Sequence, residues 1–247
     1  MPARGAPLNA EPSVQTRARR CGWTLLVSCV LAAATPAARA QTAPSPAEVA
    51  QFGALHAAAH RGDLARLAAA LAGGAQVNGR DSRGRTPLHV AAFARQREAI
   101  RRLAAAGADL GALENDRYDA VTIAAVADDE ETLKVLLALG ASAKLTTSRY
   151  DGTALIAAAH LGHDGVVRQL IAAGAPLDHV NNLHWTAAIE AVVLGDGGPR
   201  HQATLRALVD AGANLKLSDR SGQTPLQLAR SRGYEAMVRI LETAPVR

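Results

Sequence analysis

The sequence predicts an all-α solenoid of about six helix-turn-helix repeats with projecting β-hairpin loops. The first observation behind this prediction is a recurring stretch, of which Thr86-Pro87-Leu88-His89 is the clearest copy. With Leu88 as the marker, equivalent positions step along the chain by 33, 33, 34, 33 and 38 residues. A fixed period in this range is typical of solenoids. The marker positions are Leu55, Leu88, Val121, Leu155, Ala188 and Leu226.

A second mark keeps the same register. Gly-Ala pairs recur at steps of 33, 33, 34 and 38 residues, at the place where a glycine would end the second helix of each pair. Thr86 suits a helix N-cap, and Pro87 suits the first helical position because its missing N–H would be unpaired there. The pairs begin at Gly74, Gly107, Gly140, Gly174 and Gly212.

Composition and charge narrow the class of protein. The chain has 247 residues, 49% hydrophobic and 3% aromatic, which is enough for an alanine-rich core. The net charge of +5 is uneven, because residues 1–40 hold five of the 27 basic residues and one of the 22 acidic ones. The remainder is almost neutral, which argues against nucleic-acid binding.

Residues 1–40 are interpreted as a secretory signal peptide, which places the mature chain in the bacterial periplasm. Arg17, Arg19 and Arg20 form a positive region before a mostly apolar stretch. The small residues around Arg39 predict cleavage between Ala40 and Gln41. The apolar stretch is short for a membrane helix, so no span is expected in the mature form. An uncleaved N-terminal anchor is an alternative.

A second alternative is a lipid-anchored envelope protein. Leu26-Val27-Ser28-Cys29 resembles the site at which bacterial lipoproteins are cut and acylated on the cysteine. Cleavage before Cys29 would leave an apolar stretch on the mature side, which counts against it. Cleavage before Gln41 instead removes both cysteines, Cys21 and Cys29, and with them disulfides and thiolate chemistry.

The repeat region is expected to follow directly on a short polar linker, residues 41–45. Ser45 and Glu48 have the spacing of a capping box, which predicts that the first repeat begins in this helix. The repeat domain then covers residues 46–247. Its predicted repeats are about 46–78, 79–111, 112–144, 145–178, 179–216 and 217–247.

These motifs resemble the signature of ankyrin repeats. The resemblance rests on Thr86-Pro87-Leu88-His89-Val-Ala91, Gly74-Ala75-x-Val77-Asn78 and Thr224-Pro225-Leu226, and it covers residues from about 46 to 243. It implies a monomeric, non-catalytic scaffold without a cofactor that binds a protein partner, here unidentified, on a concave surface of loop tips and first helices. It also implies a structural, hydrogen-bonded role for His56 and His89.

The turns depart from the regular pattern in the middle of the array. Gly84 and Gly222 stand at the loop position that needs a positive φ, whereas Arg117 and His184 occupy it in the third and fifth repeats. Between the paired helices, Arg95 and Asp128 replace the usual glycine, which predicts weaker helix ends there. Glycine is retained in the other repeats, at Gly62, Gly162, Gly195 and Gly233.

Carried over position by position, the resemblance places candidate partner contacts on four consecutive repeats. Three of the six aromatic residues beyond residue 40 fall on three consecutive loops, and such residues are enriched at binding hot spots. Alternatively, each ring fills a gap beside its neighbouring loop. The candidate contacts are Arg83, Arg85, Phe93, Asn115, Asp116, Tyr118, Arg149, Tyr150, His160, Leu161, Asn182, Leu183, Trp185 and Leu194.

The fifth repeat carries an anomaly, because its interval of 38 residues locates a five-residue insertion between its helices. Glu190 stands where an apolar residue is usual, and a buried carboxylate needs hydrogen-bond donors. One hypothesis is that the N–H groups of Gly197 and Gly198 supply them. The other is a small-ligand or metal site, or an enzyme, that uses Glu190, Asp196 and His201. The spacing matches no strong metal or catalytic motif.

Overall fold

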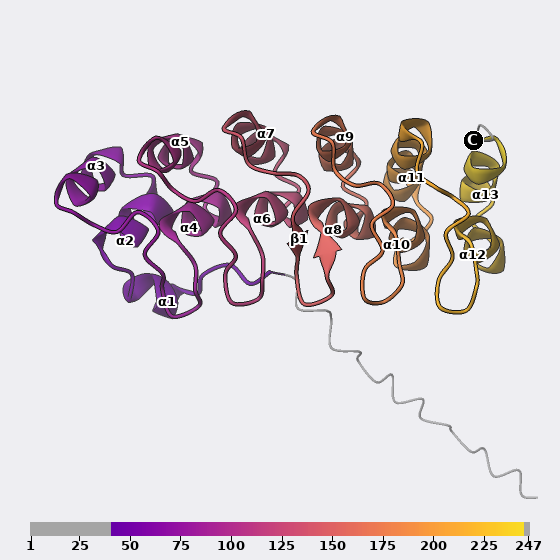
Figure 1. The fold of residues 1–247 in the computed structure, drawn as a ribbon, viewed down its shortest axis with the longest axis horizontal. Coiled ribbons are helices and arrows are strands. Elements are labelled where there is room, and N and C mark those ends of the chain that lie inside the picture. Colours follow the sequence, from indigo (N-terminus) through magenta and orange to yellow (C-terminus); the bar gives the residue numbers. More distant parts are fainter. Residues whose placement is uncertain (1–40, 245–247) are drawn as a thin grey trace, which may run out of the picture. The chain divides into compact units, whose positions relative to one another are not determined.

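The structure is a computed structural model that describes residues 41–244, and within them six helix pairs stack in sequence order (Figure 1). The first helices form one row and the second helices another, with the loops projecting from the first row. The first helices are α2 (Ala54–Arg61), α4 (Pro87–Phe93), α6 (Ala120–Val126), α8 (Ala154–Leu161), α10 (Ala187–Val193) and α12 (Pro225–Ser231). The second helices are α3 (Leu64–Ala72), α5 (Arg97–Ala105), α7 (Glu130–Ala138), α9 (Asp164–Ala172), α11 (Pro199–Ala211) and α13 (Glu235–Glu242). The prediction of an all-α solenoid of six repeats is confirmed.

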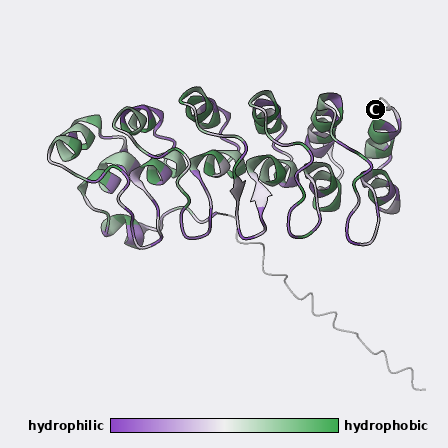
Figure 2. Cartoon of the chain, viewed as in Figure 1, coloured by the Kyte–Doolittle hydropathy of each residue, from purple (hydrophilic) through white to green (hydrophobic). Residues whose placement is uncertain are grey.

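Small residues let the first helices pack closely. A pair of alanines recurs near the end of four of these helices, and each alanine is at most 2% exposed. The second helices bury a branched apolar residue at the same point of each repeat, and Figure 2 shows the hydrophobic colour concentrated in the helices. The alanine pairs are Ala58-Ala59, Ala91-Ala92, Ala124-Ala125 and Ala158-Ala159, and the branched residues include Leu67, Ile100, Leu133, Val167 and Leu205.

The two histidines have the structural role that was predicted. Nδ1 of His89 accepts the backbone N–H of Thr86 at 3.0 Å, so the ring proton lies on Nε2. Nε2 donates to the carbonyl oxygens of Ala112 and Tyr118 at 3.0 and 3.1 Å. Burial lowers the pKa of His89 to about 4, which keeps the ring neutral. His56 makes the equivalent contact to the carbonyl of Arg85 at 3.0 Å.

The projecting loops are true β-hairpins only in the fourth repeat of the described chain, where β1 (Thr146–Thr147) pairs antiparallel with β2 (Gly152–Thr153). The expectation of a β-hairpin between each two neighbouring helix pairs is therefore corrected. The other loops are too short for a strand ladder and are closed instead by one side chain that accepts two backbone N–H groups. These side chains are Asp81, Glu114, Asn181 and Asp219.

Neighbouring loops are joined by main-chain hydrogen bonds. Asn115 N–H donates to the carbonyl of Arg83 at 3.0 Å, and Asn182 N–H donates to that of Tyr150 at 2.9 Å. Between the third and fourth repeats, the Ser148 N–H donates to the carbonyl of Arg117 at 2.9 Å. These bonds fix the spacing of the loop tips.

Six non-glycine residues of the described chain adopt the left-handed backbone, and four of them stand at the turn positions where the sequence lacks the regular glycine. Arg117 and His184 have φ values of 66° and 63°, and Arg95 and Asp128 have 57° and 52°. In the fifth repeat the prediction was wrong, because the positive φ falls on Gly197 and not on Gly195. Gly195 is required for a different reason, since a Cβ there would clash with the carbonyl oxygen of Ala191.

The N-terminal part begins with a separate short helix, α1 (Pro46–Ala50). The predicted capping box is confirmed, with the Ser45 hydroxyl and the Glu48 carboxylate each accepting the other residue's N–H. The first repeat does not begin in this helix, however. The helix α1 ends at Ala50 with Gln51 as its C-cap, and Gly53, whose backbone is extended, is the N-cap of α2. None of the helices within residues 41–244 is long and apolar enough to cross a membrane.

The two regular loop glycines provide a test of how closely the loops pack. Gly84 and Gly222 have φ values of 73° and 74°, but only at Gly84 would a Cβ meet a neighbour, the side chain of Asn115. We expect Gly222→Ala to lower the free energy of unfolding by about 1 kcal/mol through backbone strain alone. Gly84→Ala should cost more, because the Asn115 amide must also move. Urea denaturation measures both, and equal losses would contradict close packing at this loop.

Candidate functional site

The residues predicted to contact a partner fall into a covered half and an open half. Residues 41–45 and α1 run across the loops of the second and third repeats (Figure 1). Gln41 and Thr42 lie among the side chains of Arg83, Phe93 and Tyr118 and leave a cavity of only about 20 Å³. This part of the predicted contact surface is therefore partly covered by the chain itself, although the side chains of Arg83 and Asp116 remain 52% and 48% exposed.

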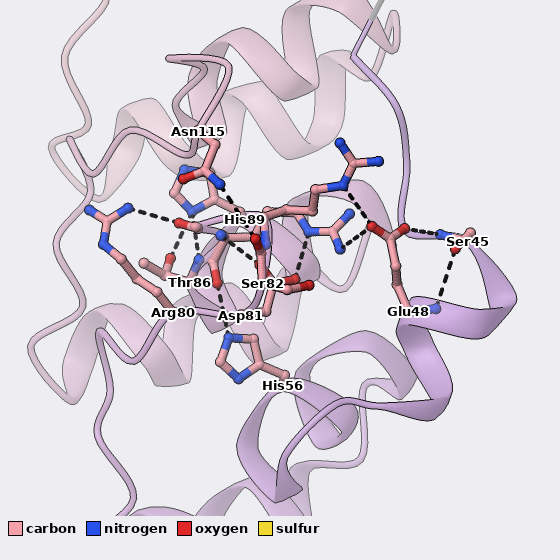
Figure 3. A network of polar contacts seen from close by, with 12 residues as sticks. Ser45, Glu48, His56, Arg80, Asp81, Ser82, Thr86, His89 and Asn115 are labelled. Carbon is pink, nitrogen blue, oxygen red and sulfur yellow. Dashed lines mark hydrogen bonds and ion pairs between the residues drawn. The ribbon is translucent and has the colours of Figure 1, made fainter.

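Two of the predicted contact residues hold this covering segment in place (Figure 3). The Glu48 carboxylate lies 2.9 Å from Nε of Arg83 and 3.3 Å from Nη2 of Arg85. Arg85 is 3% exposed and also pairs with Asp81 at 2.7 Å, so it is unavailable to a partner in this arrangement. The Ser45 N–H and the Arg83 guanidinium lower the pKa of Glu48 to about 2.

Polar residues on the next loops bind one another. Arg149 pairs with Asp116 at 2.8 Å, which links the third and fourth repeats. The side-chain amides of Asn115 and Asn182 donate to the carbonyls of Ser82 and Arg149 at 3.4 and 3.0 Å. These predicted contact residues therefore connect one loop to the next.

The three loop aromatics divide between the two alternatives. Tyr118 and Trp185 are partly buried and pack against the core, as gap-filling rings do. Tyr150 is 39% exposed, so it is free to contact a partner. Sequence spacing placed all three on loops, but it could not tell which rings fold inward.

The open half carries the large hydrophobic side chains that are exposed. All five large hydrophobic residues that are exposed within residues 41–244 lie in the fourth and fifth repeats. Four of them were predicted contacts, and Val180 was missed although it is the most exposed, at 43%. Its position at the base of a loop gave no signal, because side-chain direction there depends on the loop's conformation. We call this set the apolar patch: Tyr150, Leu161, Val180, Leu183 and Leu194.

Glu190 lies buried in the fifth repeat, one of the two that carry the apolar patch. It is 4% exposed, and its Oε1 accepts from Nδ2 of Asn181 at 3.0 Å. Its Oε2 has no hydrogen-bond partner in the described chain and lies 3.5 Å from Nδ1 of His160. Burial raises the pKa of Glu190 to about 7. The hypothesis that Gly197 and Gly198 supply its donors was wrong, since the Gly198 N–H donates to Asp196 at 2.8 Å.

Asn181 is the functional residue that the sequence reasoning missed. Its Oδ1 closes the loop as Asp81 and Asp219 do in their repeats, while its Nδ2 is the extra donor that reaches Glu190. The signal was present, because the repeat that carries Glu190 has asparagine at the loop position where Asp81 and Asp219 stand in their repeats.

Asp196 and His201 do not converge with Glu190. Nδ1 of His201 lies 2.9 Å from Asp196, and its Nε2 lies 3.0 Å from the carbonyl oxygen of His160. The inserted loop thus joins the fifth repeat to the fourth, and Tyr234 joins it to the sixth by donating to the Gly195 carbonyl at 3.0 Å. Across residues 41–244, no three His, Cys, Asp or Glu side chains are grouped to hold a metal ion.

The buried carboxyl group makes stability depend on pH in a defined direction. Since the pKa of Glu190 is about 7 in the folded chain and near 4.5 when unfolded, the folded chain retains a proton that the unfolded chain loses. The free energy of unfolding should therefore fall as the pH rises from about 4.5 to about 7. Glu190→Gln removes this term, so its stability relative to the parent should grow by up to about 3 kcal/mol over that range.

Urea denaturation at several pH values measures this difference. Glu131→Gln, at an exposed site on α7, is the matched control and should give a nearly constant difference. A constant difference for Glu190→Gln as well would show that the carboxyl group titrates normally in the folded chain.

Comparison with known proteins agrees with this architecture. The family model for ankyrin repeats (3 copies) matches residues 38–114 and 121–219. A protein of Escherichia coli strain K12, described as the ankyrin repeat protein YahD, is 33% identical over 188 residues, covering 76% of this chain and 93% of its own length. An ankyrin repeat-containing protein of Treponema pallidum strain Nichols is 35% identical over 104 residues, which cover 41% of this chain and 33% of that protein.

Solved structures show the same arrangement. An ankyrin repeat domain from Acinetobacter baumannii AYE has a TM-score of 0.73 and 42% identity, covering 77% of this chain and 96% of that one. The ankyrin repeat domain of Bcl-3, a member of the IkappaB protein family, has a TM-score of 0.71 and 26% identity, covering 79% and 87%. With helix pairs, loop ties and sequence register all in agreement, this chain belongs to the ankyrin-repeat family.

Proposed function

We propose that this protein is a non-catalytic scaffold of the bacterial periplasm that binds a partner protein through the apolar patch on its concave side. Ankyrin repeats typically mediate protein–protein interactions, and proteins built from them are generally non-catalytic scaffolds. Export to the periplasm is supported by the signal-like composition of residues 1–40, which lie outside the residues that the structure describes.

The apolar patch is the observation that carries this proposal. Exposed hydrophobic residues scattered singly need no explanation, but here every large one in the described chain lies in two adjacent repeats. The loops that present Tyr150 and Leu183 are joined to each other by the Asn182–Tyr150 hydrogen bond. Because the loops are already fixed, a partner that docks there loses little ordering entropy.

A small-ligand or metal site, or an enzyme, in the fifth-repeat loop has less support. Asp196 and His201 are paired with each other, and Glu190 is held by Asn181. Only the unpaired Oε2 of Glu190 favours this alternative, and it is buried. The protein-binding function explains more of the surface.

Removing the apolar patch should weaken binding of the partner. We expect the variant Leu161→Ser/Leu183→Ser/Leu194→Ser to bind its partner at least about tenfold more weakly, because apolar contacts of this size contribute more than 1.4 kcal/mol together. The measurement is affinity capture from a periplasmic extract, followed by titration of the captured protein. The matched control, Arg101→Ser/Lys134→Ser/Arg206→Ser, changes three exposed residues on second helices and should bind normally. Unchanged binding by the patch variant would move the contact surface elsewhere.

Export should release a mature chain that begins at Gln41. Signal peptidases require small residues before the cut, so Ala40→Leu should cause the uncleaved precursor to accumulate. Mass spectrometry of the protein from the producing cell distinguishes the alternatives. An acylated Cys29 at the N-terminus would establish the lipid-anchored form, and an intact chain in the cytoplasm would contradict export.

A further inference from the structure

Residues 41–48 lie on the chain's own concave side in the way that a bound peptide would. Residues 41–45 form neither helix nor strand, and the backbone at Ser45 is extended. Gln41 and Thr42 line a small cavity together with loop residues of the second and third repeats. On the second repeat this space is bordered by Arg83 and Phe93, and on the third by Asp116 and Tyr118. One extended segment thus bridges two repeats.

The grip on this segment is a carboxylate held by two guanidinium groups. Glu48 pairs with Arg83 at 2.9 Å and with Arg85 at 3.3 Å. Figure 3 shows the Glu48 carboxylate beside Ser45 and facing two guanidinium groups. Arg85 is oriented from behind by Asp81 and lies over the ring of Phe52, 5.9 Å from its centroid. The contact with Arg83 is a charge-assisted hydrogen bond, the strong and geometrically specific kind, whereas Nη2 of Arg85 makes no hydrogen bond and contributes an ion pair alone. The second repeat therefore presents a formed receptor for a carboxylate.

The rest of the contact is weak. The helix α1 has only five residues and buries none of them. A helix of this length is unstable without tertiary support. Between α1, the start of α2 and the loop of the second repeat lies an open pocket of about 270 Å³, lined by residues that include Glu48, Phe52, His56 and Arg80. The segment is held mainly by its polar anchor, with little apolar packing.

We propose that the loops of the second and third repeats form a groove for an extended segment whose carboxylate pairs with Arg83 and Arg85, and that residues 41–48 fill this groove as a displaceable intramolecular ligand. The ligand class is an acidic, extended peptide segment. That residues 41–48 dock in the groove is supported by the contacts described above. That a partner protein displaces these residues rests on the proposed function. A partner with such a segment would bind through the apolar patch and, in addition, place its acidic segment in this groove.

The test supplies the segment as a separate molecule. The receptor is the full chain with residues 41–50 replaced by ten alternating Gly and Ser residues, which empties the groove and leaves the repeats unchanged. The probe is a synthetic peptide of residues 41–51, acetylated and amidated, titrated with the protein's NMR chemical shifts as the signal. We expect saturable binding with a dissociation constant of about 1 mM or tighter, because an unlinked peptide lacks the effective concentration of the tethered one.

Three matched changes should each weaken binding at least tenfold. In the parent chain the tethered segment competes with the peptide. In the peptide, Glu48→Gln removes the charge and preserves the shape. In the receptor, Arg83→Ala removes half of the guanidinium pair, whereas Arg101→Ala on α5 is the control and should have no effect. Raising the salt concentration should also weaken binding.

Three results would overturn the proposal. One is the absence of saturation up to about 10 mM peptide with a receptor of normal helicity, since tethered segments have effective concentrations in the mM range. Another is equal binding of the Glu48→Gln peptide. The last is unfolding of the Gly/Ser receptor, which would show that residues 41–50 are an obligatory structural cap. Each result is independent of the apolar patch, which stays intact, so it leaves the proposed protein-binding function unaffected.

Discussion

The structure depends on polar groups that each repeat leaves open for its neighbour. The loop carbonyls of one repeat accept hydrogen bonds from the next, as in the bonds from Asn115 to Arg83 and from Asn182 to Tyr150. In the opposite direction, the ring of His89 in the second repeat donates to the Tyr118 carbonyl of the third. An unpaired buried carbonyl is costly, so a repeat is stable only when its neighbour is in place. The stability of such an array resides largely in these interfaces between repeats.

The same constraint decides which side chains are free for function. Residues at regular loop positions, such as Asp81 and Asn115, are committed to backbone groups, and Arg149 is committed to Asp116. What remains for binding are the side chains that break the pattern. Leu161 and Leu194 are exposed at the ends of α8 and α10, where tight packing would favour smaller residues. Glu190 breaks the pattern inside the core, at a cost in stability that a regular apolar residue would avoid.

The sequence was sufficient to predict the repeat register, the capping box at Ser45 and the structural histidines, because these follow from local spacing. The sequence could not predict that α1 is separate from the first repeat. A glycine at position 53 is compatible with a break between two helices and equally with a continuous connection. Spacing also gave no account of Asn181 as the partner of Glu190, because that contact depends on how one loop folds over the next helix. The pairing of Glu48 with Arg83 was missed for a similar reason. The contact joins segments 35 residues apart that share no pattern.

The filled groove and the apolar patch lie on the same row of fixed loops, and this arrangement affects how a partner is recognised. In the function proposed above, a partner first meets the apolar patch, because the groove of the second and third repeats is already filled. Once it is docked, any acidic segment that it carries is tethered near the groove and competes with residues 41–48 at a high effective concentration. Residues 41–48 thus exclude a partner that lacks an acidic segment from the groove. Such a partner contacts only the apolar patch and binds more weakly than one that contacts both surfaces. Specificity then comes from the combination of an apolar contact and a carboxylate, and each is presented by different repeats of the same fixed scaffold.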